Sequence, residues 1–293
     1  MKKVYINYAD QIFKKEQNFA LRAAKYRGKF DVVIGASPKN IDEKFHKEYS
    51  HILNEKRGGG YWLWKPYLIK KTLASLEYGD YLFYSDSGAY FLKKIDILIS
   101  VLNSSGQDIM GFEMPLIEGQ WTKKELFVNM DCVDEIFSES NQIMASFILI
   151  KRTNQSDKFF SEFLKYSCNE INITDKFIEN VKQNNDFIDH RHDQSIFSLL
   201  YKKYNLKPFK DPSQLGNLPA QYISPLIEDI DLSGSINQLH GKKFRIKKYP
   251  ETYNNILLHY RGSGKPIKSF FVYYLKIYYP KVYKAISNLE KKT

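Results

Sequence analysis

Short β-rich runs alternate with amphipathic segments along this chain from its start to about residue 200. Residues 4–8 and 30–34 have the composition of strands. Between them, apolar residues from Ile12 to Tyr26 share one helical face, and Gly28 is placed to end that helix. A strand–helix–strand start favours a parallel sheet with a right-handed crossover. Because no internal repeat or long linker interrupts the alternation, we predict one α/β domain with a Rossmann-like, mainly parallel sheet flanked by helices.

The later elements follow the same alternation. We expect Asp10 to cap the first helix, and Pro66 suits the first position of another. The continuous apolar run at 143–150 predicts a central strand. Residues 118–123 are polar and aromatic without a clear period, so we expect a loop there. Further helices are predicted at 41–53, 93–103, 156–166 and from about 192, and further strands at 81–84, 108–112 and 256–259.

The first functional candidate lies between residues 58 and 91. Three glycines at 58–60 predict a turn, and Trp62 and Trp64 follow as an aromatic group that belongs either to the core or to a ligand platform. Asp86 comes just after the predicted strand 81–84. In open α/β sheets, ligands bind outside the carboxyl ends of the strands. We therefore expect Asp86 to bind a divalent cation or a sugar hydroxyl; the alternative is that it only caps the next turn.

A second candidate follows the last predicted strand. His259 directly ends an apolar run, and Arg261, Gly262, Gly264 and Lys265 come next. Glycines let backbone N–H groups approach a phosphate, and the cations neutralise its charge. This spacing predicts a diphosphate site, with a solvated basic turn as the alternative.

Two further sites have polar side chains that suggest a function: the start of a predicted helix and the lysine beside the two tryptophans. Asp193 and Gln194 open a predicted helix, where they either face a reacting sugar or simply cap the helix N-terminus. Lys65 stands beside two tryptophans and needs an anionic or a cation–π partner there.

The net charge of the chain indicates which class of binding partner to expect. With 44 basic and 33 acidic residues, the net charge is +11, which favours an anionic partner, although an AT-rich genome would also raise the lysine content. Cys132 and Cys168 lack the spacing of a zinc ribbon, so we expect two reduced thiols. The first ten residues lack the apolar run of a signal peptide, and no 18-residue apolar stretch predicts a membrane helix.

Taken together, these motifs resemble bacterial glycosyltransferases of the GT-A fold that build polysaccharides and capsules. Those enzymes carry a glycine-rich Tyr-Trp-x-Trp-Lys-Pro segment followed by Tyr-x-Asp-x-Gly. The chain is more distantly similar to the retaining family of glycogenin and the lipooligosaccharide galactosyltransferases, and the similarity covers residues 4–266. The segments that match that retaining family, in order along the chain, are Tyr84-Ser85-Asp86-Ser87-Gly88, Met144-Ala145-Ser146, Asp193-Gln194-Ser195 and His259-Tyr260-Arg261-Gly262-Ser263-Gly264-Lys265-Pro266.

The resemblance implies roles for these positions. It places the nucleotide base and ribose at the end of the first strand and puts Asp193 and Gln194 near the anomeric carbon. It also implies that Asp86 and His259 bind the donor together with Mn²⁺ or Mg²⁺, but Gly88 stands where the family has its second metal-binding Asp. Without metal, Lys65, Arg261 and Lys265 would neutralise the leaving diphosphate. The implied donor-binding residues are Asn7, Tyr8, Ala9, Asp10, Lys65, Asp86, His259, Arg261, Gly262 and Lys265.

Residues 267–293 differ in composition from the preceding domain, 1–266. Aromatic residues alternate with lysines, and Glu290 is the one acid. We expect a helical tail that either docks on an anionic membrane surface or packs on the domain, and no binding of nucleic acid.

The combined prediction is a retaining glycosyltransferase at the inner, cytoplasmic face of the cell membrane. It would move a sugar from a nucleotide diphosphate sugar, most simply a UDP-sugar, to a glycan or lipid-linked acceptor. A non-catalytic basic binding protein and an inactive transferase relative are the competing interpretations.

Overall fold

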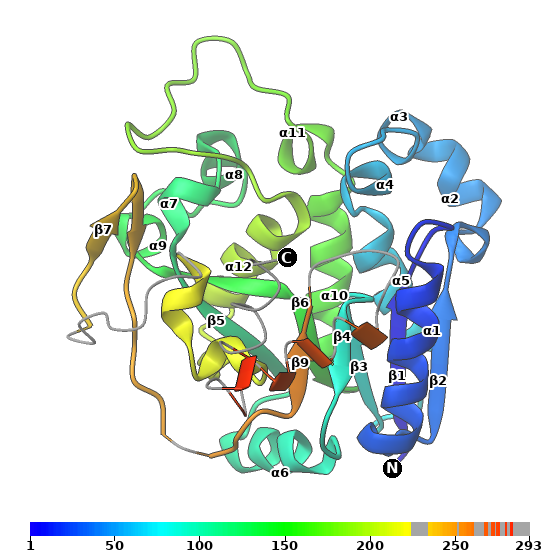
Figure 1. The fold of residues 1–293 in the computed structure, drawn as a ribbon. Helices are drawn as coiled ribbons and strands as arrows, with labels where there is room; N and C mark the ends of the chain where they lie inside the picture. Colours follow the sequence, from blue (N-terminus) through cyan, green and yellow to red (C-terminus); the bar gives the residue numbers. More distant parts are fainter. Residues whose placement is uncertain are drawn as a thin grey trace, which may run out of the picture.

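The computed structural model describes residues 1–223, 234–250 and 252–260, together with positions 267–268, 271–272, 274–275, 279 and 282–283. Within them, a seven-stranded sheet has the strand order β2-β1-β3-β6-β5-β8-β7 (Figure 1). The strands are β1 (Lys3–Tyr8), β2 (Val32–Ala36), β3 (Tyr81–Ser85), β5 (Ile109–Ile117), β6 (Asn141–Lys151), β7 (Asn237–Leu239) and β8 (Lys242–Phe244).

The sheet is mixed, so the prediction of a mainly parallel sheet is wrong. β1 runs parallel to β2 and β3. β6, however, lies antiparallel between β3 and β5, and β8 and β7 are added antiparallel at the β5 edge. The reason is the connection after β5: residues 118–140 return the chain to the sheet at the same end, so β6 runs back along its neighbour. The prediction of a central strand at 143–150 is confirmed.

A second, two-stranded sheet forms beside the main one. β4 (Ala89–Phe91) pairs antiparallel with β9 (Leu257–His259), with Ala89 opposite His259. The late strand predicted at 256–259 is therefore present, but it joins this small sheet rather than the main one. This pairing brings His259 close in space to the end of β3, from the opposite end of the domain sequence.

Helices cover both faces of the main sheet (Figure 1). α5 (Trp64–Ala74), α10 (Asn154–Ser167) and α12 (His192–Lys203) share one core with Ile6 and Leu82, whereas α6 (Asp96–Ser105) and α1 (Lys14–Ala23) pack on the other face with Tyr5 and Phe83. Neighbouring residues of one strand thus point into different cores. The shorter helices are α2 (Glu43–Glu48), α3 (Ser50–Leu53), α4 (Gly58–Tyr61), α7 (Glu118–Trp121), α8 (Lys124–Asn129), α9 (Glu135–Ser138) and α11 (Glu170–Ile173), and a π-helical turn, Ala24–Gly28, follows α1.

Several local predictions need correction. The first helix begins after Phe13 rather than at Asp10, whose carboxylate accepts the N–H groups of Ile12 and Phe13 in a preceding turn. Ile12 and Tyr26 are exposed, so they are not part of its buried face. The helix expected at 41–53 is split into α2 and α3. Pro66 is the third residue of α5 rather than its first.

The segment 118–123, expected to be a loop, contains the buried helix α7. Among the described residues, no helix is both long enough and apolar enough to cross a membrane. The described positions of the expected tail are mostly helical, and the Tyr279 N–H donates to the Leu275 carbonyl. Most of the tail lies outside the described residues.

Candidate functional site

Lys65 lies at the centre of a charged cluster formed by four separate segments. Its side chain leaves the first turn of α5 and is 3% exposed. The ammonium nitrogen lies 2.6 Å from Asp193 Oδ2, 3.5 Å from Asp86 Oδ1 and 3.2 Å from the Ala145 carbonyl oxygen. These oxygens come from the start of α12, the end of β3 and the middle of β6. The cluster therefore unites three residues that the sequence motifs nominated independently.

Asp86 is fixed where β3 ends. All five residues of β3 are buried, and the Asp86 N–H continues the ladder by donating to the Ser146 carbonyl of β6 at 2.9 Å. The Tyr84 hydroxyl donates to Asp86 Oδ1 at 2.7 Å. Burial, followed by the Asp86 charge, holds the pKa of Tyr84 well above its usual value, so this hydroxyl stays a donor. The Asp86 side chain nevertheless remains 36% exposed, which leaves it accessible to a ligand.

The turn before α5 is built from left-handed backbone. Gly58, Gly59, Gly60, Tyr61 and Trp62 all have positive φ. At Gly60, a Cβ would lie 2.6 Å from the Leu53 Cα, so only glycine fits this position. Two consecutive non-glycine residues with positive φ are costly, and such strain is concentrated at functional sites. This turn directs Lys65 inward at the start of α5.

Aromatic stacking holds the flanks of the cluster. The Tyr8 and Trp64 rings stack with 3.8 Å between centroids, and the Trp62 ring stacks on His192 at 5.3 Å. His192 is itself in the left-handed region, with φ 51°, at the first residue of α12. Trp64 is almost fully buried, so it supports the half-buried Tyr8 from behind. Of the two tryptophans, Trp64 is therefore part of the core, whereas Trp62 stays partly exposed beside His192.

Burial dominates the electrostatics of the cluster. It raises the pKa of the Asp193 carboxyl to about 6, an increase that Lys65 only partly offsets. Burial alone would lower the pKa of Lys65, but the charges of Asp193 and Asp86 outweigh it and raise that pKa. Lys65 is therefore charged at neutral pH. Two carboxylates and one ammonium leave a formal charge of −1.

Gln194 faces β6 rather than the ammonium. Its Oε1 accepts the Ala145 N–H at 3.4 Å, and its Nε2 donates to Gln142 Oε1 at 2.8 Å. Gln142 in turn donates to Glu118 Oε1 at 3.0 Å. Glu118 is fully buried and forms an ion pair of 2.5 Å with Lys202. This series of polar contacts, of which the sequence motifs nominated only Gln194, holds the start of α12 against the central strand.

The four residues implied for the nucleotide lie at the carboxyl end of β1, beside Asp86, but their side chains differ in access. Asn7 is fully buried and donates to the Tyr5 hydroxyl at 3.2 Å. Ala9 is also buried, and its N–H donates to the Ala36 carbonyl. Tyr8 and Asp10 retain partial exposure. The Ser87 hydroxyl donates to the Tyr8 carbonyl at 2.6 Å, which ties this edge to the turn after β3.

His259 and Gly88 meet in the small sheet. The Gln214 side chain donates to the His259 carbonyl at 2.6 Å and accepts the His259 N–H at 2.8 Å. The His259 imidazole packs edge-on against Phe147 with 5.0 Å between ring centroids. The Tyr260 N–H donates to the Gly88 carbonyl at 2.8 Å. A Cβ at Gly88 would lie 2.1 Å from the Tyr260 carbonyl oxygen. The backbone of Tyr260, just after β9, thus occupies the space of any side chain at position 88.

The described residues do not fit a divalent cation. They contain no group of three His, Cys, Asp or Glu side chains arranged to hold a metal. The Asp86 carboxylate already accepts the Tyr84 hydroxyl and faces the Lys65 ammonium. Position 88 has no room for a second carboxylate. Arg261, Gly262 and Lys265 lie outside the described residues.

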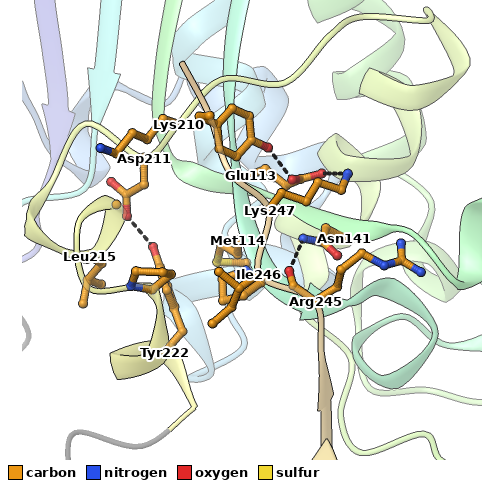
Figure 2. Close-up of a pocket in the computed structure, with 14 residues that line it drawn as sticks. Glu113, Met114, Asn141, Lys210, Asp211, Leu215, Tyr222, Arg245, Ile246 and Lys247 are labelled. Carbon is orange, nitrogen blue, oxygen red and sulfur yellow. Dashed lines mark hydrogen bonds and ion pairs between the residues drawn. The ribbon is translucent and has the colours of Figure 1, made fainter. Parts of the chain in front are cut away.

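A pocket lies on another part of the sheet (Figure 2). Glu113 at its wall pairs with Lys247 at 2.7 Å and accepts the Tyr249 hydroxyl, and Tyr222 donates to Asp211 Oδ2 at 2.7 Å. Its charged carboxylates therefore have partners within the protein. None of the residues nominated from the sequence lines it.

Comparison with known proteins identifies the fold. No family model matches the sequence, and no curated protein is significantly similar to it. Mouse xyloside xylosyltransferase 1, in its apo form, is 9% identical with a TM-score of 0.50, over 89% of this chain and 98% of that one. The fold is therefore a GT-A-like α/β domain.

Two further solved structures match with lower TM-scores. GlyE from Streptococcus pneumoniae is 15% identical with a TM-score of 0.41, covering 89% of this chain and 55% of its own. The galactosyltransferase LgtC, in complex with donor and acceptor sugar analogues, is 13% identical with a TM-score of 0.42, covering 88% and 87%.

Proposed function

We propose that this protein is a glycosyltransferase that moves a sugar from a nucleotide diphosphate sugar, with uridine as the base, to a glycan or lipid-linked acceptor of surface polysaccharide synthesis. One observation carries the proposal. Asp86, Lys65 and Asp193, nominated by three separate motifs, converge at the carboxyl end of β3 in a GT-A-like fold. That edge is where open α/β sheets bind their ligands.

The geometry suggests a distribution of roles. Tyr8, supported by Trp64, offers a flat ring to the base. The accessible side of Asp86 accepts hydrogen bonds from ribose or sugar hydroxyls. Arg261 and Lys265 would neutralise the diphosphate, with the backbone of Gly262 allowing close approach.

The transfer step needs a small number of groups. The bond between sugar C1 and the diphosphate oxygen breaks, and the acceptor hydroxyl oxygen forms a bond to C1. In a retaining reaction, the hydroxyl proton passes to the departing diphosphate on the same face of the sugar. Asp193 and Gln194 lie at the N-terminus of α12, where a carboxylate and an amide would stabilise positive charge developing at C1. Retention is proposed from the resemblance to the glycogenin family.

The site of action is proposed to be the inner face of the cell membrane. Ile267 and Phe271, at the start of the basic aromatic tail, are exposed. Lysines of residues 267–293 would bind anionic headgroups while the aromatic rings enter the interface. A lipid-linked acceptor would be presented on the same surface.

Donor binding and turnover test this function. Uridine diphosphate or one of its sugars should raise the melting temperature, because a ligand of the folded state stabilises it by mass action. Wild-type protein should also release UDP from the stabilising donor. Asp86→Asn and His259→Ala should reduce release by about a hundredfold, the usual scale for losing a charged contact in the transition state.

Asp42→Asn is the matched control, because Asp42 is an exposed carboxylate that precedes α2 and pairs with Lys71 of α5, the helix that also carries Lys65. It should release UDP at the wild-type rate. Stabilisation by no nucleotide diphosphate, or full activity in both site variants, would contradict the proposal. Stabilisation without turnover would indicate an inactive relative, and vesicle binding alone would indicate a basic binding protein.

A further inference from the structure

The surroundings of Lys65 resemble those of a bound ion more than those of a substrate contact. An ammonium has three N–H donors, and the three short contacts of Lys65 all go to oxygens of the protein: two carboxylates and one backbone carbonyl. Hard divalent cations prefer the same oxygen ligands. We propose that Lys65 is a built-in cation, whose ammonium occupies the position between Asp86 and Asp193 where a divalent ion would otherwise bind, so that the donor site needs no added metal.

The fold holds the ammonium in this position. The Lys65 N–H donates to the Trp62 carbonyl at 2.9 Å, directly after the left-handed turn. The side chain passes close to two aromatic rings, with the nitrogen 5.3 Å from the Tyr84 centroid and 6.0 Å from that of Trp64. Withdrawal of the ammonium would leave Asp193 buried without its counter-charge. Lys65 is therefore a structural cation, not a mobile one that swings out to a phosphate.

Electrostatic repulsion explains why the Lys65 ammonium and a divalent ion would exclude one another from this cluster. With Lys65 present, the cluster has a formal charge of −1, and a divalent ion bound to Asp86 would lie within a few ångströms of an ammonium. Without Lys65, the charge becomes −2, and two carboxylates and a carbonyl oxygen face the vacated volume. Such a set suits a divalent ion that keeps its remaining waters. The Tyr260 backbone against Gly88 leaves no room for an additional carboxylate.

This inference rests on the proposed function only in assigning the cluster to the sugar donor. The cation test itself requires no donor. We would titrate the wild-type chain and Lys65→Ala with Mn²⁺ at pH 7.5 and measure free Mn²⁺ by electron paramagnetic resonance. The wild-type chain should show no Mn²⁺ site that depends on Asp86. Lys65→Ala should bind one Mn²⁺ per chain, at least tenfold more tightly than any wild-type site.

Two control variants test whether the gained Mn²⁺ site depends specifically on the loss of Lys65 and on Asp86. Lys71→Ala removes a lysine of the same helix that pairs with the exposed carboxylate of Asp42, and it should gain no site. Lys65→Ala combined with Asp86→Asn removes one of the two acidic ligands and should lose the gained site. Circular dichroism confirms that each variant is folded before titration.

The outcomes separate clearly. A folded Lys65→Ala chain that gains no Mn²⁺ site would overturn the inference, as would a wild-type site abolished by Asp86→Asn. If Lys65→Ala does not fold, two measurements on the wild-type chain test the inference. One is its Mn²⁺ titration, and the other is the rise in melting temperature that UDP causes in EDTA and in Mn²⁺. Equal shifts support the built-in cation, and a shift that requires Mn²⁺ contradicts it. Lack of sugar transfer would leave the Mn²⁺ result unchanged and would count only against the proposed function.

Discussion

Asp193 combines two properties that seldom occur together in a side chain. It is almost fully buried, and its carboxylate forms an ion pair of 2.6 Å with the Lys65 ammonium. Burial raises the pKa of its carboxyl to about 6, from an ordinary value of 3.8. Between these two values the folded chain binds more protons than the unfolded chain. Stability contributed by this residue is therefore lost as the pH rises through that window.

This gives a prediction with a defined sign. The free energy of unfolding of the wild type minus that of Asp193→Asn should fall by at most about 3 kcal/mol between pH 4 and pH 7, since one pKa unit is worth about 1.4 kcal/mol. Urea unfolding at several pH values measures it. Asp42 is the matched control: its hydrogen bonds from Lys71 and Tyr67 lower the pKa of its carboxyl, so the difference should change in the opposite direction. A difference that rises with pH at Asp193 would contradict the assignment.

At the scale of residues, the sequence nominated Asp86, Lys65 and Asp193 but not their mutual contacts. Each motif marked a polar group at the end of a strand or the start of a helix. That the Lys65 ammonium points to two carboxylates depends on the register of β3 with β6 and on the left-handed turn at 58–62. Neither can be read from local composition. The same applies to Gly88, whose need for glycine comes from Tyr260.

At the scale of elements, α12 is held to β6 and α7 by buried polar contacts. Glu118 has no exposed surface, and it accepts hydrogen bonds from Thr122, Gln142 and Ser198 in addition to the Lys202 ion pair. Removing one partner of a buried ion pair leaves a charge that neither water nor the protein stabilises. The pair therefore fixes the helix that carries Asp193.

Lys202→Met should destabilise the protein by about 3–5 kcal/mol. Glu118→Gln in the same chain should recover part of this loss, because the amide needs no counter-charge. Chemical denaturation with both variants measures the effect. Lys203→Met serves as the control, since Lys203 donates to the Met130 carbonyl, a neutral partner, and its loss should cost about 1 kcal/mol. Equal destabilisation by the two lysine substitutions would show that the ion pair has no special role.

The sequence located most long elements because their periodicity is local. Strands β1, β3 and β6 and helices α10 and α12 lie close to their predicted positions. Helix α7 was missed because its four residues are too few for a period, and all four are buried by contacts distant in sequence. Asp10 was assigned to the helix start because its composition suits both a cap and the preceding turn.

At the scale of the whole molecule, the direction of the strands was the feature that could not be predicted from the sequence. A strand buried on both faces has the same apolar run whether its neighbours are parallel or antiparallel. The apolar run of β6 therefore fits both arrangements, and only its pairing with β3 and β5 distinguishes them. The α/β class followed from the alternation of elements and the GT-A likeness from the resemblance of the motifs, whereas the mixed sheet required the structure.

The charge of +11 and the basic aromatic tail give a prediction for the whole chain. The protein should sediment with vesicles containing anionic phospholipid at low salt, and binding should weaken at least tenfold in 0.5 M salt because the Debye length falls below about 5 Å. Replacing Lys268, Lys276, Lys281 and Lys284 with glutamine should have a similar effect, since each lysine near such a surface contributes about 1 kcal/mol.

A matched variant tests whether the tail or the overall charge is responsible. It replaces four exposed lysines outside the tail, Lys14, Lys15, Lys39 and Lys44, with glutamine, and removes the same charge. Unchanged binding of this variant supports docking through residues 267–293. Equal loss in both variants would assign the interaction to net charge alone.

The close approach of Tyr260 to Gly88 has a consequence for how the proposed donor site is assembled. The missing side chain at position 88 sets the separation between the turn after β3 and the last described strand. The hydrogen atom at position 88 thus allows the close approach of the strand that carries His259. Any larger residue would push Tyr260 away from the turn after β3. A directed change of substrate range by widening the proposed donor site would accordingly begin at this glycine.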